Sequence, residues 1–221
     1  MINRLALFDC DGTLVDSAAN ICTAMESTFV DAGLPPPPRT ATRRVVGLSL
    51  VEAMTVLHPG GVPADHVALA ERYKRAFHLL RGQGRIAEPL FPGIAAAIEA
   101  LDAAGWLLGV ATGKSDRGLN YCLDHHGLLA RFVTLQTADR HPSKPHPSMA
   151  LQAMADAGAA PETTIVIGDT AYDIGMAKAA GARAIGVAWG YHDRAELLAE
   201  GADAVAEDPA DLPRLMETLA G

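Results

Sequence analysis

The sequence predicts an α/β fold, in which a parallel β-sheet carries helices and an all-helical segment is inserted after the first strand. Three observations support this prediction. A short apolar run at Leu5 to Phe8 is typical of a buried strand. From Pro92 onward, helix patterns alternate with short apolar runs, as in βαβ units. Between these regions, residues 17–85 contain helix patterns and no strand pattern.

Size and composition favour a folded, soluble protein. The chain has 221 residues, enough for one large domain or for a domain that carries an insertion. No apolar run approaches the ~20 residues of a membrane span, and the N-terminus lacks a secretory pattern, so we expect a cytoplasmic protein without a membrane partner. A net charge of −8 without dense Lys or Arg stretches disfavours a nucleic-acid partner.

The first predicted strand ends on two aspartates, Asp9 and Asp11, which a glycine turn follows at once. Ligands of open α/β sheets bind at the carboxyl ends of the strands. Because side chains alternate along an extended chain, both carboxylates can point to one site while Cys10 turns away. A solvated Asp-Gly turn is the alternative, unless later segments bring partners to the same edge.

The inserted segment contains three helix patterns, which end near Gly33, Leu57 and Gly82. Four consecutive prolines form a stiff connector between the first two patterns, and Gly47 interrupts the second. We expect residues 16–85 to form a small helical domain. Residues 1–15 and 86–221 would then form the α/β domain.

Later strand patterns, at 106–111, 132–135, 163–167 and 183–188, precede a short one at 202–205 and a final helix. Polar residues follow two of these strands, and a proline-rich loop supplies one ammonium group. They are Thr112 with Gly113, Asp169 with Asp173, and Lys144.

Carboxylates, a hydroxyl and an ammonium at one sheet edge predict a site for a magnesium ion and a phosphate. Mg²⁺ prefers oxygen ligands and binds through one or two carboxylates together with waters. Asp9 could attack phosphorus, and Asp11 could protonate the leaving oxygen and later deprotonate water. Thr112 and Lys144 could hold phosphoryl oxygens, whereas Lys114 is expected to matter less for phosphate binding.

Four short motifs occur along the chain in a fixed order. They are DCDGT, the Thr of ATGK, the Lys of SKPHP, and GDTAYD. Together they resemble the motifs of the haloacid dehalogenase-like hydrolase superfamily, which implies a Rossmann-like core with a helical cap. The resemblance implies that Asp9 is the nucleophile and Asp11 the general acid and base. It also implies phosphate binding by Thr112, Gly113 and Lys144, and Mg²⁺ on Asp9, the Asp11 backbone carbonyl and Asp169, with Asp173 in a supporting position.

The position of the helical segment resembles the cap of the phosphoglycolate phosphatase branch. This implies a Mg²⁺-dependent phosphatase that acts on a small phosphorylated metabolite through an aspartyl-phosphate, with 2-phosphoglycolate as the leading candidate. Arg43 and Arg44, just before Gly47, could turn towards the opening and hold a substrate carboxylate. Of the histidines, His192 is the one most expected to line the site.

Other functions remain open at this stage. A β-phosphoglucomutase-like phosphotransferase would use the same groups. A receiver-type signalling module also combines acids, a Thr and a Lys around Mg²⁺, although receivers are shorter and place the phosphoacceptor on a later strand. A dehalogenase has no use for Asp11, and a phosphonatase is disfavoured because Lys74 has a solvated sequence context. The oligomeric state is not predicted.

Overall fold

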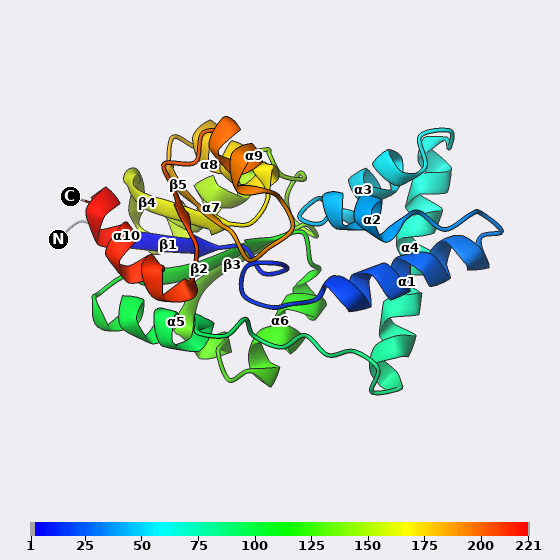
Figure 1. The fold of residues 1–221 in the computed structure, drawn as a ribbon, viewed down its shortest axis with the longest axis horizontal. Coiled ribbons are helices and arrows are strands. Elements are labelled where there is room, and N and C mark those ends of the chain that lie inside the picture. Colours follow the sequence, from blue (N-terminus) through cyan, green and yellow to red (C-terminus); the bar gives the residue numbers. More distant parts are fainter. Residues whose placement is uncertain (1–2, 221) are drawn as a thin grey trace.

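The computed structural model describes residues 3–220, in which a six-stranded parallel sheet forms the centre (Figure 1). Its strand order is β3-β2-β1-β4-β5-β6, the doubly wound order of Rossmann-type sheets, which differs from the 2-1-3-4-5 order of receiver-like folds. The predicted α/β fold is confirmed. The strands are β1 (Asn3–Phe8), β2 (Leu107–Thr112), β3 (Phe132–Thr137), β4 (Ala159–Gly168), β5 (Arg183–Val187) and β6 (Ala204–Ala206).

Helices cover both faces of the sheet, so its central strands are apolar on both sides. In β1, Ala6 and Phe8 pack with the apolar cluster on one face of the sheet, whereas Leu5 and Leu7 pack with the cluster on the other face. The helices of this part are α5 (Ile94–Ala103), α6 (Asp116–His125), α7 (Ser148–Ala157), α8 (Ala171–Ala179), α9 (Arg194–Ala199) and α10 (Leu212–Ala220). Short 3₁₀ turns lie at Leu129–Arg131 and Pro209–Asp211.

The segment between β1 and α5 is helical and has its own apolar cluster, which Met25, Phe29, Met54, Leu69 and Tyr73 help to form. Figure 1 shows it beside the sheet, at the end where β1 leads into α1. Its division from the rest as a separate domain stays a prediction. Its helices are α1 (Ala18–Asp31), α2 (Arg39–Arg44), α3 (Leu50–Leu57) and α4 (Pro63–Gly82).

The second expected helix is two helices, α2 and α3, separated by a turn. Gly47 lies in this turn with a φ of 97°, a left-handed conformation that glycine adopts without steric cost. Within residues 3–220, none of the helices has both the length and the apolar character required to cross a membrane.

Candidate active site

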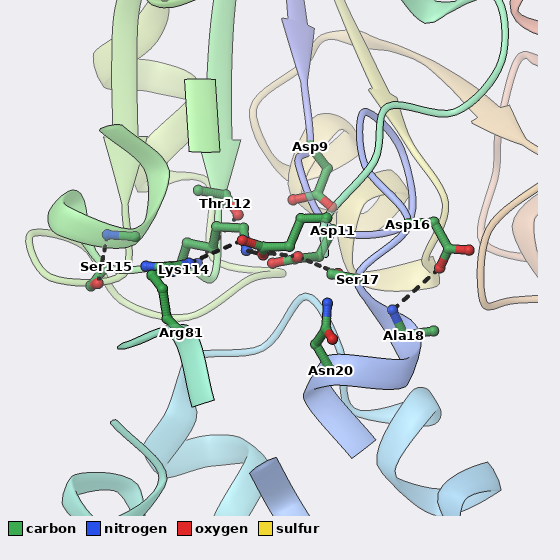
Figure 2. Close-up of polar contacts among 12 residues, drawn as sticks. Asp9, Asp11, Asp16, Ser17, Ala18, Asn20, Arg81, Thr112, Lys114 and Ser115 are labelled. Carbon is green, nitrogen blue, oxygen red and sulfur yellow. Dashed lines mark hydrogen bonds and ion pairs between the residues drawn. The ribbon is translucent and has the colours of Figure 1, made fainter. Parts of the chain in front are cut away.

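The carboxyl end of β1 places two buried acids at the edge of the sheet. Asp9 is 1% exposed and Asp11 is 7% exposed, while the intervening Cys10 packs in the core. Figure 2 shows both carboxylates near Thr112, which ends the neighbouring strand β2. Thr112 is also buried, and its hydroxyl oxygen accepts a hydrogen bond of 3.2 Å from the Lys114 backbone N–H.

Lys144 binds two acids of the site at once. Its Nζ donates to Oδ1 of Asp9 and to Oδ1 of Asp173, both at 2.6 Å. All three side chains are almost fully buried. Burial raises the pKa of Asp9 from 3.8 to about 7, although the positive charge of Lys144 opposes this shift. Burial disfavours the Lys144 ammonium, but Asp173 and Asp9 outweigh it and raise the pKa of Lys144.

Asp9, Asp169 and Asp173 form a cluster of acids whose oxygens lie within 4.8 Å of one another. Oδ2 of Asp9 is buried and, among the described residues, has no hydrogen-bond partner. A buried carboxylate oxygen without a partner is costly, and a bound cation would remove that cost. Oxygen donors of this kind suit Mg²⁺, so the residues fit the expected ion.

The other two acids of the cluster are oriented by backbone and hydroxyl groups. Asp169 accepts from the Thr13 hydroxyl and from the Tyr191 backbone N–H, both at 2.9 Å. Burial, followed by the charges of the neighbouring acids, raises the pKa of Asp169. Oδ2 of Asp173 accepts from the backbone N–H and hydroxyl of Thr170 at 3.0 and 2.7 Å, so its Oδ1 stays directed at the lysine.

Gly12, in the turn after the acid pair, is required by close packing. Its φ is 94°, and a Cβ at this position would lie 2.2 Å from Oδ2 of Asp169. Any larger residue here would displace the Asp169 carboxylate.

Asp11 belongs to a second network, which sequence reasoning missed. Nζ of Lys114 lies 2.9 Å from Oδ1 of Asp11 and 2.6 Å from Oε1 of Glu88. Glu88 also accepts from Arg81 at 3.0 Å, and the Ser17 hydroxyl donates to Asp11. Figure 2 shows the labelled members side by side. The network therefore connects the acid at the sheet edge with helix α4.

Little in the sequence could have revealed this network. Lys114 follows Thr112 closely and so lies near the predicted edge, which is a weak signal. Glu88 and Arg81 come from the end of the helical segment and the chain that follows it, where no motif marks them.

The structure contradicts the placement of Arg43 and Arg44 at the opening. Both are exposed, and Arg44 forms an ion pair with Glu196, with N–O distances of 2.6 Å. Thr42 near the end of α2 and Val46 in the following turn take the inner face of this segment, and the two arginines between them point outward. Of the residues that the structure describes, Gly47 lines the cavity, as expected, and the two arginines do not.

His192 also lies elsewhere than expected. Among the described residues it does not line the cavity, and its Nδ1 accepts from the Ala171 backbone N–H at 3.2 Å. Burial, with the nearby Arg44 charge, lowers the pKa of His192.

A cavity of about 290 Å³ opens between the helical segment and the sheet edge. Asp9, Asp11, Thr112 and Gly113 line its base. Residues of the four helices α1 to α4, of the turn between α2 and α3, and of the loop that leads from β2 into α6 line the rest. The acid at the end of β1 is therefore reachable from a chamber large enough for a small organic molecule.

A family model described as haloacid dehalogenase-like hydrolase matches residues 6–187. A protein of Dickeya dadantii named probable phosphatase IndB is 37% identical over 197 residues, covering 88% of this chain and 85% of that protein. A phosphoglycolate phosphatase of Aquifex aeolicus is 31% identical and covers 97% of both chains. The crystal structure of a hydrolase from Pseudomonas syringae superposes with a TM-score of 0.86 at 26% identity, covering 99% of this chain and 100% of that one.

Proposed function

The chain belongs to the haloacid dehalogenase-like hydrolase family and is a phosphoric monoester hydrolase, and we propose that it is a Mg²⁺-dependent phosphatase acting on a small metabolite. One observation carries this proposal. The buried carboxylate of Asp9 is held by Lys144 through Oδ1, while its Oδ2 lacks a partner among residues 3–220. A carboxylate oxygen in this state is suited to metal binding. The remaining lone pairs of the same carboxylate are available to attack phosphorus.

The proposed reaction has two steps. A carboxylate oxygen of Asp9 attacks phosphorus, the bond to the ester oxygen breaks, and protonated Asp11 gives its proton to that oxygen. Asp11 then takes a proton from water, which attacks the aspartyl-phosphate and releases phosphate with Asp9 restored. The side chain of Asp11 would leave Lys114 and Ser17 to reach the substrate.

Charge is the main obstacle to the first step. Two like charges 4 Å apart repel by about 4 kcal/mol at an effective dielectric constant of about 20. Bound Mg²⁺ would neutralise part of this charge, and Asp9, Asp169 and the Asp11 backbone carbonyl would hold it. Lys144, the Thr112 hydroxyl and the Gly113 backbone N–H would bind the phosphoryl oxygens in the transition state.

The names of relatives favour 2-phosphoglycolate as the substrate, because several are phosphoglycolate phosphatases. The arginine pair that also favoured it does not line the cavity. We further infer that residues 16–85 act as a cap over the site. A cytoplasmic location, without nucleic-acid or membrane partners, remains part of the proposal.

Assays of the purified protein against a panel of phosphate esters, with and without Mg²⁺, test this proposal. Release of phosphate should require Mg²⁺, and Asp9→Asn should abolish it because an amide is a poor nucleophile. Asp16→Asn is a matched control, since Asp16 is exposed on the same loop. Wild-type turnover in Asp9→Asn would disprove the nucleophile assignment, and a long-lived phosphoprotein would favour phosphoacceptor signalling instead.

A further inference from the structure

Apolar side chains form much of the cavity wall on the side of the helical segment. They include Ile21, Met25, Val46, Leu48, Tyr73 and Phe77. Most of these also belong to the apolar cluster of that segment, so their positions are set by packing. The wall is therefore a preformed apolar surface.

The aromatic part of this wall lies close to the catalytic acids. Tyr73 and Phe77 are one turn apart on α4, with ring centroids 5.9 Å apart. Nζ of Lys114 lies 5.9 Å from the Phe77 ring centroid and 2.9 Å from Asp11. Asp9 and Asp11 line the same cavity as these rings, so the organic part of an ester bound at Asp9 would extend into the space beside them.

The buried cations of the cavity contact carboxylates of the chain, although Nε of Arg81 has no hydrogen-bond partner among residues 3–220. Lys114 is held between Asp11 and Glu88, and its side chain is 9% exposed. Arg81 contacts Glu88 at 3.0 Å and lies over the Tyr121 ring, 4.3 Å from its centroid. At Lys114, a substrate carboxylate would have to compete with Asp11 and Glu88, and the separation of those pairs would leave a buried charge without a partner.

The other cations of the cavity lie at its exposed margin. Lys74 pairs with Glu71 at 2.8 Å on the surface of α4. Arg117 is exposed at the start of α6 and forms no ion pair within the described part of the chain. Contacts of exposed charges are weak, so neither residue provides a strong carboxylate site.

We propose that the preferred substrate is a phosphate monoester of a predominantly apolar alcohol, and not a short carboxylated ester such as 2-phosphoglycolate. The proposal rests on the proposed phosphatase function and names the substrate class of the same site. The phosphoryl group binds at the base of the cavity, beside Asp9, Thr112 and Gly113. The organic part lies against Phe77, Tyr73 and the neighbouring aliphatic side chains, where burial of apolar surface provides affinity.

Calorimetric titration of the wild-type protein with phosphonates in Mg²⁺ tests this without requiring turnover. Affinity should rise from ethyl- to butyl- to hexylphosphonate, by up to about fourfold for each buried methylene. Butylphosphonate should also bind more tightly than phosphonoacetate, which is of similar size but carries a carboxylate. Affinity that does not change with chain length, tighter binding of phosphonoacetate, or no binding of any phosphonate would each overturn the proposal.

Two variants locate the apolar surface. Phe77→Ala should lower the ratio of hexyl- to ethylphosphonate affinity by roughly tenfold, because it removes the aromatic wall. Leu79→Ala is the matched control, since Leu79 lies on the same helix and is 63% exposed, and it should leave the ratio unchanged. An unchanged ratio in Phe77→Ala would contradict the assignment. Phe77→Leu, which keeps an apolar side chain, should retain an intermediate ratio.

Hydrolysis of p-nitrophenyl phosphate is measured in parallel, so that the two proposals fail separately. Chain-length dependence without Mg²⁺-dependent hydrolysis would refute the phosphatase mechanism and leave the binding preference standing. Hydrolysis with no preference for longer alkyl groups would refute the substrate class and leave the phosphatase function standing.

Discussion

Replacing the proposed nucleophile should make the metal-free protein more stable. Asp9 is buried beside Asp169 and Asp173, and its Oδ2 lacks a partner within residues 3–220. Its ionisation therefore costs free energy in the folded state, despite the ion pair with Lys144. Asp9→Asn removes that ionisation and keeps nearly the same shape, so it should raise the free energy of unfolding while abolishing turnover.

The magnitude follows from the shifted pKa. A rise in the Asp9 pKa from 3.8 to about 7 corresponds to about 4 kcal/mol of unfolding free energy. Because the folded state has the higher pKa, this stability is fully present below about pH 4 and is lost as the pH rises through 7. The amide must also find partners beside Lys144, which offsets part of the gain, so we expect about 2 to 4 kcal/mol at pH 8.

Urea denaturation in EDTA, at pH 8 and at pH 5, measures the difference between Asp9→Asn and the wild type. The difference should fall below about 2 kcal/mol at pH 5, where the Asp9 carboxyl is mostly protonated in the folded wild type. Titrations of acids far from the site occur in both proteins and cancel, whereas Asp169, whose pKa the Asp9 charge helps to raise, ionises more readily in Asp9→Asn and adds to the gain at pH 8. Adding Mg²⁺ at pH 8 should stabilise the wild type more than the variant and narrow the difference.

The exposed Asp16 provides the control, because Asp16→Asn makes the same chemical change in the same loop. It should alter the unfolding free energy by less than about 1 kcal/mol at either pH. The reasoning is refuted if Asp9→Asn is no more stable than the wild type at pH 8 in EDTA. A gain that is equal at both pH values would also refute it, since the cause would then not be ionisation.

Three further predictions concern other parts of the structure. Lys144→Met should lower the unfolding free energy by about 3 to 5 kcal/mol in urea denaturation, because it leaves buried acids without their cation. Lys178→Met, on the surface, should lower it by less than about 1 kcal/mol, and similar losses in the two variants would contradict the prediction. Glu88→Gln should lower kcat by roughly tenfold or more in a steady-state assay, because it weakens a charge-assisted contact to Lys114; an unchanged kcat would separate the network from catalysis. Burial, aided by the charge of Arg140, lowers the pKa of His141, so the contribution of neutral His141 to stability is present above about pH 6.5 and is lost as the pH falls below it. His141→Gln should therefore lose less unfolding free energy than the wild type between pH 7 and pH 5. Equal losses in the two proteins would exclude this role.

Much of the fold could be predicted from the sequence, because it depends on local patterns. Apolar runs bounded by glycines and acids locate β1, β2, β4 and β5 to within a few residues. Parallel strands place their carboxyl ends at one edge of the sheet, so the acids after β1 and β4 had to lie near each other. Lys144 was identified because it follows a strand and belongs to an ordered set of motifs.

The helical segment shows where local patterns are insufficient. The sequence marks Arg43 and Arg44 as the cations nearest Gly47. The direction of their side chains depends on how this part of the chain is rotated. The packing of Thr42 and Val46 against the rest of the segment decides that rotation. In the structure Arg44 therefore lies on the outside with Glu196.

The sequence by itself determined the parallel sheet, the helical insertion and the set of polar residues that follow the strands, since each depends on neighbours along the chain. The tertiary structure alone decided that Lys114, Glu88 and Arg81 meet beside Asp11, and that apolar side chains face the cavity. The physical reason is that these contacts join segments distant in the sequence. Such pairs form only when packing brings the segments together, and no periodicity within either segment encodes the partner.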